Sequence, residues 1–186
     1  MGHSQEQKRA THDRIVQNAA SRFRERGFNG ISVADLMNEV GMTVGGFYKH
    51  FSSRDALVGE ALVVALQDYN AFEGAETDAG RVIDRYLSEE HRDSVGTGCA
   101  LGALAAYMPQ VGPAEKEIYT AQFTESLAAA GASISPAAPD RERAAALLMM
   151  CSLIGAITVA RAVDDPALSA EILHTVAAEL KQVTAR

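Results

Sequence analysis

Apolar residues near the start of the chain recur every three to four positions. They form a stripe along one side of a helix, whereas the charged residues of the same stretch lie off it. The members of the stripe are Ile15, Val16, Ala19, Ala20 and Phe23. Gly27 follows, at a place where glycine often ends a helix in the left-handed conformation. The pattern predicts an amphipathic first helix that stops before Gly27, with Ser4 and Gln7 as a capping box at its start.

A second, shorter helix is indicated immediately afterwards. Ser32 and Asp35 have the spacing of an N-cap residue and an acidic residue at the third helical position. Gly41 is placed to end this helix after about two turns. We therefore predict a short capped helix that begins after Ser32 and ends near Val40.

Two further helix starts follow the glycine turn. Thr43 is placed to cap a short helix over residues 43–49, and either Ser52 or Ser53 is placed to cap the next helix. Short capped helices joined by a glycine turn are typical of a helix-turn-helix. The spacing predicts this motif between residues 32 and 51.

The remaining apolar periodicity favours helices throughout the rest of the chain. No stretch alternates apolar and polar residues for long enough to predict a sheet. Thr77 or Asp78 is expected to cap a helix that includes residues 82–87, and the polar residues 88–98 read as a connection. The other helices are expected at residues 53–72, 97–108, 115–130, 140–163 and 166–184.

Charge is distributed unevenly along the chain, whose formal net charge is −7. Residues 1–54 hold eight Lys or Arg and five Asp or Glu, whereas residues 55–186 hold nine and nineteen. Phosphate binding depends on the local potential more than on the total charge. The first part of the chain is therefore suited to meet an anionic polymer, while the acidic remainder favours solubility.

The run "GISVADLMNEVGMTVGGFYKHFSSRDAL", residues 30–57, closely resembles the DNA-binding signature of TetR-family transcriptional regulators. The preceding "RFRERGFNG" is similar as well, so that the specific match covers about residues 10–60. The resemblance implies an all-α protein of about nine helices. It implies a helix-turn-helix DNA-binding domain over residues 1–54 and a ligand-binding and dimerisation domain over residues 55–186.

The residues of the motif have chemistry suited to DNA. Two glycines at the start of the helix let its N-terminus approach DNA closely, where backbone N–H groups favour phosphate. Tyr, Lys and His side chains add donors for phosphate oxygens. By resemblance to the family, we expect contacts to the DNA backbone from Ser32, Thr43, Tyr48, His50 and Arg54, with Lys49 as a further donor. The resemblance assigns the base-facing edge to Val44, Gly45 and Gly46, and the side chain of Val44 suits only a thymine methyl group.

The longest apolar run, Ala144–Ala160, has 17 residues between Arg143 and Arg161. This length is short of the roughly 20 residues that cross a membrane. A helix apolar nearly all round is typical of one buried on several sides. We therefore expect a cytoplasmic protein without membrane contact. The resemblance implies that the last two helices pair with those of a second copy, whereas the alternative is a large monomeric core.

Aromatic, Met and Cys residues of the middle helices are candidates for an effector cavity, because pliable Met side chains suit apolar ligands. The candidates are Tyr86, Cys99, Tyr107, Phe123, Met149 and Met150. The same set would equally form ordinary core. Cys99 is expected in the first turn of a helix, where the helix dipole lowers a thiol pKa, with Arg92 nearby. Cys151, inside the apolar helix, is expected to be structural.

The sequence holds no catalytic motif, no metal-ligand spacing and no cofactor signature. The absence of these motifs argues against an enzyme, and the resemblance implies a dimeric regulator that binds a double-stranded DNA operator and is released by a small-molecule effector. Two alternatives remain open. One is a small-molecule or electrophile-binding protein whose helix-turn-helix is only structural, and the other is an enzyme that depends on Cys99.

Overall fold

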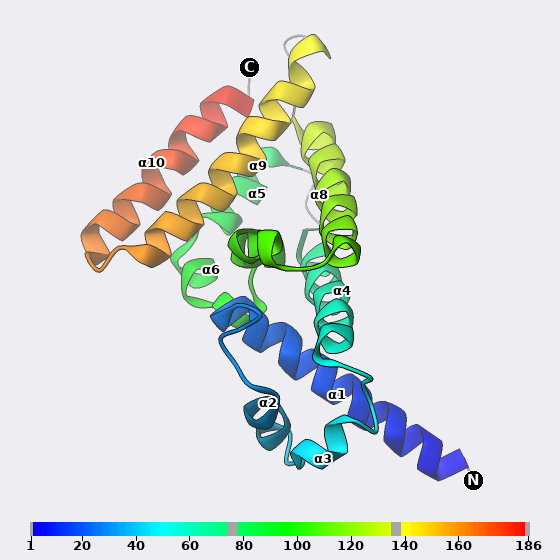
Figure 1. Cartoon of the computed structure of the whole chain (residues 1–186). Helices are drawn as coiled ribbons and strands as arrows, with labels where there is room; N and C mark the ends of the chain where they lie inside the picture. Colours follow the sequence, from blue (N-terminus) through cyan, green and yellow to red (C-terminus); the bar gives the residue numbers. More distant parts are fainter. Residues whose placement is uncertain (1, 74–77, 135–138, 185–186) are drawn as a thin grey trace.

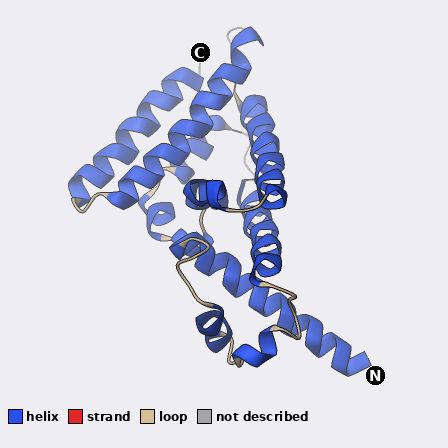
Figure 2. Cartoon of the chain, in the orientation of Figure 1, coloured by secondary structure: helices blue, strands red, loops and turns tan. Residues whose placement is uncertain are grey.

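A computed structural model describes residues 2–73, 78–134 and 139–184, and the regular structure in these ranges is entirely helical (Figure 2). The expected all-α class is confirmed. The described residues form ten α-helices, which is close to the nine expected, and two 3₁₀ helices. The α-helices are α1 (Gly2–Arg26), α2 (Val33–Glu39), α3 (Val44–Phe47), α4 (Arg54–Glu73), α5 (Ala79–Tyr86), α6 (Glu89–Asp93), α7 (Ala100–Leu104), α8 (Pro113–Ser133), α9 (Pro139–Ala162) and α10 (Pro166–Thr184), and the 3₁₀ helices are η1 (Val95–Thr97) and η2 (Ala105–Gln110).

The first helix is the predicted amphipathic one. All five residues of its apolar stripe are buried. Gly27 ends it with a positive φ of 70°, and its N–H donates to the carbonyl oxygen of Phe23 at 2.8 Å. The helix begins at Gly2, however, so the expected capping box of Ser4 and Gln7 is wrong. Both residues lie inside the helix instead of at its start.

The helix-turn-helix forms from α2 and α3 at one end of the molecule (Figure 1). Ser32 caps α2 as predicted, because its hydroxyl accepts from the Asp35 N–H at 3.1 Å. Gly41 takes a positive φ of 73° in the turn that follows. Thr43 occupies the N-cap position of α3, but its side chain makes no capping hydrogen bond.

α3 is shorter than the predicted 43–49. It spans only Val44–Phe47, and residues 48–50 form turns. Gly45 and Gly46 make up half of this helix, and glycine in a helix costs about 1 kcal/mol relative to Ala. The helix therefore has little intrinsic stability, and the buried Phe47 holds it in place.

The middle of the chain differs most from expectation. Residues 88–98, expected as a connection, contain α6 and η1, and Ser88 caps α6 by accepting from the His91 N–H at 3.1 Å. The helix expected at 97–108 is divided into α7 and η2, with Pro109 inside η2. Short helices of this kind contain too few residues for an apolar period to be visible in the sequence.

Helix starts elsewhere follow the sequence more closely. Ser53, rather than Ser52, accepts from the Ala56 N–H at the start of α4. Asp78 caps α5 by accepting from the Arg81 N–H at 2.9 Å, and the alternative Thr77 lies outside the described residues. Helices α8, α9 and α10 each begin at a proline, a residue that is well suited to the first helical position.

α9 and α10 lie side by side at the end of the molecule opposite α3 (Figure 1). α9 was expected to be buried on several sides, but within one chain only one of its faces is covered. Apolar side chains on the other face, and on α10, are exposed: Leu147, Leu148, Val159, Leu168 and Val183. Among the described residues, one segment, Glu142–Ala162, is long and apolar enough to span a membrane by length and composition alone. Of its apolar 18-residue stretch, 39% is buried inside the structure.

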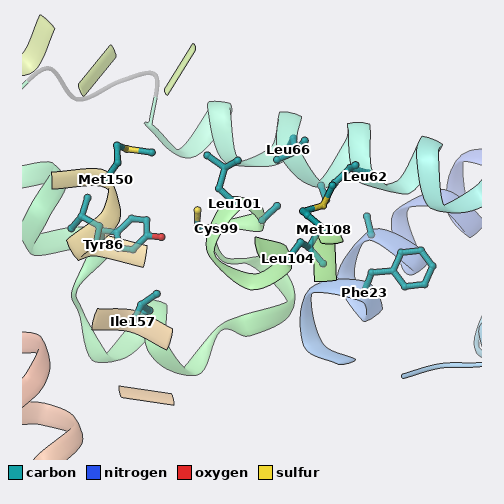
Figure 3. Close-up of a cluster of buried hydrophobic side chains, with 14 of the residues drawn as sticks. Phe23, Leu62, Leu66, Tyr86, Cys99, Leu101, Leu104, Met108, Met150 and Ile157 are labelled. Atoms are coloured by element: carbon teal, nitrogen blue, oxygen red, sulfur yellow. The ribbon is translucent and has the colours of Figure 1, made fainter. Parts of the chain in front are cut away.

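The core runs without interruption from α1 to α9, as the cluster in Figure 3 shows for Phe23, Leu104 and Ile157. α1 packs against α4, α7 and η1. The predicted domain boundary between residues 54 and 55 falls at the start of α4. This helix packs on α1 and also on α8. The boundary remains a prediction, because packing alone does not divide the chain there.

Candidate DNA-binding site

One buried residue anchors α3 in the core and leaves the opposite edge of this helix exposed. Phe47 is 1% exposed, and its ring stacks on Phe51 at a centroid distance of 5.2 Å. With Phe47 facing inward, Val44 is 45% exposed and Tyr48 is 71% exposed. This edge of the helix is therefore available for contact with another molecule.

The two glycines of α3 have different surroundings. A Cβ at Gly45 would meet nothing within 4 Å, so this position faces open space. A Cβ at Gly46 would lie 3.2 Å from the terminal carbon of Met42 and 3.7 Å from that of Met37. Gly45 therefore fits the predicted base-facing edge, whereas Gly46 also allows α3 to pack closely on the preceding turn.

Other predicted contacts lie on the same side of the molecule. Thr43 and Lys49 are exposed, and neither side chain has a hydrogen bond to the described residues. Ser32 is exposed too, but its hydroxyl already donates to the Asp35 carboxylate at 2.6 Å besides capping α2. The side chains of Thr43 and Lys49 are therefore free to bind phosphate. The Ser32 hydroxyl would have to bind phosphate while it also bonds to Asp35.

His50 is half-buried against the first helix. Its ring lies 6.0 Å from that of His12 and 6.3 Å from that of Phe51. Its Nδ1 is buried and has no hydrogen-bond partner among the described residues. Burial, followed by the positive charges of His12, Lys8 and Lys49, lowers the pKa of His50. The imidazole is therefore neutral at pH 7 and acts as a hydrogen-bonding group, not as a fixed charge.

Arg54 was predicted to contact phosphate, but the structure gives its guanidinium partners within the chain. It donates to the carbonyl oxygen of Ile31 at 2.9 Å, to the carbonyl oxygen of Phe28, and to Asn29 Oδ1 at 3.3 Å. These bonds fasten the loop between α1 and α2 to the start of α4. The geometry favours a structural role for this side chain.

Two features of the site were not anticipated from the sequence. His12 Nε2 lies 2.6 Å from Glu60 Oε2, and the His12 ring stacks on Phe51 at 4.6 Å, so that α1, α4 and the end of the motif are joined. Lys8 lies close enough to His50 to affect its pKa. Residues about 40 positions apart meet here, so neither feature has a signal in local spacing.

The predicted effector residues occupy several places in the part of the chain that the structure describes. Tyr86, Cys99, Met149 and Met150 are buried in the core, and Phe123 is half-buried (Figure 3). Met149 and Met150 line a cavity of only about 50 Å³. Tyr107 lies apart from the others, because its ring is 6.3 Å from that of Phe28 and would collide with a Cβ at Gly27. It packs where α1 ends, at the junction between the motif and the body of the protein.

Cys99 is the N-cap residue of α7, one position before the first turn in which it was expected. It is 2% exposed, its N–H donates to His91 Nε2 at 3.0 Å, and its sulfur accepts from the Gly102 N–H at 3.4 Å. Arg92, expected nearby, instead binds Asp93 and Ser169.

The second cysteine also differs from expectation. Cys151, which was expected to be structural, is exposed on α9 in the single chain. The sequence of α9 is apolar on all sides of the helix. Composition therefore does not indicate which face packs on the rest of the chain. In the described ranges, no group of three His, Cys, Asp or Glu side chains lies close enough to hold a metal ion.

Comparisons with known proteins agree with this geometry. Residues 15–61 match the family model of bacterial regulatory proteins of the tetR family. A curated relative, the HTH-type transcriptional repressor DhaR of Mycobacterium sp. (strain GP1), is 28% identical over 93 residues. That match spans 47% of this chain and 47% of the relative, so the chain covers about half of the relative's length.

Solved structures share the fold over nearly the whole chain. A TetR-family transcriptional regulator from Agrobacterium tumefaciens superposes with a TM-score of 0.77 at 22% identity, covering 96% of this chain and 100% of that one. The reduced form of E. coli NemR superposes with a TM-score of 0.74 at 16% identity, covering 95% and 97%. The family match in the helix-turn-helix and the shared all-helical fold lead to one conclusion: residues 15–61 carry the DNA-binding segment of the tetR family, and the chain is similar in fold to TetR-family regulators.

Proposed function

We propose that the chain is a transcriptional repressor that binds a palindromic double-stranded DNA operator as a homodimer and is released by a small-molecule effector. The observation that carries this proposal is the exposed edge of α3. Val44, Tyr48 and Lys49 are exposed there, and neither Tyr48 nor Lys49 has a side-chain hydrogen bond within the described residues. Phe47 is the only buried residue of α3, so this helix contributes more to an external contact than to the core.

The contacts that we propose follow from the side chains of this edge. Val44 and Gly45 would face the bases, while Thr43, Tyr48, Lys49 and His50 would bind phosphate. An apolar Val44 and a bare Gly45 offer the bases few hydrogen bonds. Specificity would therefore depend largely on DNA shape and on the spacing of two half-sites.

The homodimer that we propose uses the uncovered face of α9 and α10. Leu148, Val159 and Leu168 are exposed on it, and a Cβ at Gly155 would meet nothing within 4 Å. Apolar side chains on two adjacent helices, with a glycine that allows close approach, suit the same surface of a second copy. This pairing would also account for the apolar face of α9 without a membrane, consistent with a cytoplasmic protein.

A gel-shift assay with the DNA that flanks the chain's own gene tests the proposal. We expect binding at low salt that weakens steeply as salt is raised, because phosphate contacts release counterions. Tyr48→Ala should weaken the binding. Lys116→Ala provides the matched control, because Lys116 is exposed on α8, away from the motif. Indifference to all such DNA at low salt would contradict the proposal.

The small-molecule effector that we propose includes thiol-reactive compounds, because Cys99 lies in the body of the protein at the start of α7. The alternative function, an electrophile-binding protein with a purely structural helix-turn-helix, makes the opposite predictions. It requires that Tyr48→Ala changes nothing and that Cys99→Ser abolishes activity. Because Cys99 is 2% exposed, a reagent would reach it only after local opening of the core.

A further inference from the structure

The first turns of α1 extend beyond the part of the helix that packs on the rest of the chain. Residues 5–10 are all exposed, whereas Thr11 and His12 are half-buried and begin the packed part. At a rise of about 1.5 Å per residue, residues 5–10 add roughly 9 Å of helix. This end of α1 lies at the same end of the molecule as α3 (Figure 1). We call residues 5–10 the α1 extension.

Two cations of the α1 extension have no partner among the described residues. Lys8 and Arg9 are exposed, and neither side chain has a hydrogen bond or an ion pair within the part of the chain that the structure describes. In contrast, Arg14, Arg22 and Arg24 of the same helix donate to carbonyl or carboxylate oxygens of the chain. Lys8 and Arg9 are therefore available to an external anion.

Lys8 lies on the side of α1 that faces the helix-turn-helix. It precedes His12 by one turn, and residues four apart share a face of a helix. The His12 ring lies 6.0 Å from that of His50 and 4.6 Å from that of Phe51. Burial, and then three positive groups that include Lys8 and Lys49, lower the pKa of His50. Lys8 is therefore close to the exposed residues that follow α3.

The acidic residues of this part of α1 lie on a different face. Glu6 and Asp13 are both exposed, and they are about two turns apart, so they share one side of the helix. At about 100° per residue, that side lies roughly 150° around the helix from Lys8, with Arg9 between the two. The positive charge of Lys8 is thus directed to the motif, whereas the negative charges are directed away from it.

The composition of the α1 extension favours nucleic acid over lipid as a partner. A helix that binds a membrane surface presents a stripe of large apolar residues, whereas residues 5–10 read "QEQKRA". Lys and Arg side chains without a partner suit phosphate oxygens. The like charges of Lys8 and Lys49 repel each other in the free protein, and a polyanion that contacts both removes this repulsion. DNA bound to the exposed edge of α3 would be such a polyanion.

We propose that the α1 extension is a second DNA-binding surface, in which Lys8 and Arg9 bind phosphates of the duplex next to the segment contacted by α3. This inference rests on the proposed DNA-binding function and extends the contact to residues outside the helix-turn-helix. Phosphate contacts position a protein on DNA without reading its sequence. The surface therefore adds affinity and salt dependence, but no base preference.

The salt dependence of DNA binding by the full chain counts these contacts. The probe is the fragment from the flank of the chain's own gene that the gel-shift assay retards. Each phosphate contact contributes about 0.9 to the slope of log K against log salt. Lys8→Gln combined with Arg9→Gln should lower this slope by about two units and weaken binding roughly 10- to 100-fold at about 0.1 M salt. A wild-type slope in this double variant would overturn the proposal.

Glu6→Gln is the matched control within the α1 extension. It changes the net charge by the same amount as Lys8→Gln but in the opposite direction, and Glu6 lies on the face directed away from the motif. Lys116→Gln removes an exposed cation on α8. Neither control should change the slope. A change from either control as large as that from Lys8→Gln would show that only the overall charge matters, and would overturn the proposal.

Duplexes with single neutral methylphosphonate linkages locate the contacts on the DNA. Neutralising a phosphate that Lys8 or Arg9 binds should weaken binding by the wild type and leave binding by the double variant unchanged. These phosphates should adjoin those to which the Tyr48→Ala variant has become insensitive. The proposal would be overturned if no linkage affected the wild type more than the double variant, or if such linkages lay apart from the Tyr48 positions.

The remaining outcomes separate this proposal from the proposed function. A wild-type chain that binds no DNA at low salt would overturn both. Wild-type binding with an unchanged slope in the double variant would overturn only the second surface. Binding to phosphatidylglycerol vesicles that depends on Lys8 and Arg9, without any effect of these residues on DNA binding, would assign the α1 extension to a membrane instead.

Discussion

Arg24 donates through Nε to the carbonyl oxygen of Gly96 at 2.7 Å and through Nη1 to the carbonyl oxygen of Ala65 at 3.0 Å. A single side chain of α1 thereby holds both η1 and α4. Arg24 is buried, and these two carbonyl oxygens help to offset the cost of keeping its charge in the interior. We regard this residue as the main polar connection between α1 and the body of the protein.

Replacing Arg24 by Met should therefore destabilise the protein. The apolar stem is retained, but two carbonyl oxygens lose a charged donor, which costs about 1–3 kcal/mol for a buried group. Urea denaturation of the variant should show a lower midpoint with an unchanged slope. A free energy of unfolding equal to that of the wild type would show that water replaces the side chain at no cost.

Gly96→Ala should be as damaging for a different reason. A Cβ at this position would lie 2.5 Å from Glu25 Oε1 and 2.7 Å from Ser21 Oγ, so these two side chains would have to turn away or η1 would have to move from α1. We expect a lower melting temperature and weaker DNA binding. Gly45→Ala is the matched control for stability, because a Cβ there meets nothing within 4 Å. It should leave the melting temperature unchanged or raise it by a few degrees, because Ala has the higher helix propensity.

Tyr48→Ala should weaken binding to all DNA sequences alike, because a phosphate contact carries no sequence information. The loss of one hydrogen bond corresponds to about 0.5–1.5 kcal/mol, with no change in stability because the side chain is 71% exposed. Val44→Ala should shift sequence preference only slightly. Binding selection with a randomised operator measures both, and a large change in specificity from Val44→Ala would contradict our assignment of the base-facing edge.

Arg54→Met separates the structural role of this residue from the phosphate contact expected by resemblance. Three acceptors in the loop between α1 and α2 lose their donor, so stability should fall by about 1–3 kcal/mol. The slope of log K against log salt should remain that of the wild type. A slope reduced by about one unit would instead establish a phosphate contact.

Stability should fall as the pH is lowered below about 6.5, in part because of His91. Burial lowers the pKa of this histidine in the folded state, so below the unfolded value of about 6.5 the unfolded chain binds more protons. The free energy of unfolding therefore rises with pH between the folded and unfolded pKa values and is constant above them. His91→Gln, whose side-chain oxygen can accept from the Cys99 N–H, should reduce this dependence. The exposed His174→Gln should not reduce it.

The two cysteines should react at very different rates with N-ethylmaleimide. Cys151 is exposed and Cys99 is buried, so labelling should be fast and confined to Cys151, as checked with Cys151→Ser and Cys99→Ser. Cys151 lies on the proposed dimer face, so its labelling should slow as the protein concentration rises. Concentration-independent labelling would place the dimer contact elsewhere.

The sequence by itself determined the elements that depend on local chemistry. The apolar stripe of α1, the Ser32 cap and the turn glycines Gly27 and Gly41 all form as predicted, because caps and periodicity act over a few residues. For the same reason the helix-turn-helix and the exposed residues of α3 could be identified in advance. The family resemblance was carried by this segment.

Only the tertiary structure decided which groups meet across the chain. Arg54 binds the loop after α1, and Tyr107 packs at the end of α1. A cavity lined by Arg85, Ser88 and Thr97 is formed partly by the short helix α6, which has no apolar period to reveal it. The sequence of α9 is apolar on all sides, so it could not predict which face of this helix is exposed. For Arg54 and Tyr107 the partner lies tens of residues away, and packing, not local propensity, selects it.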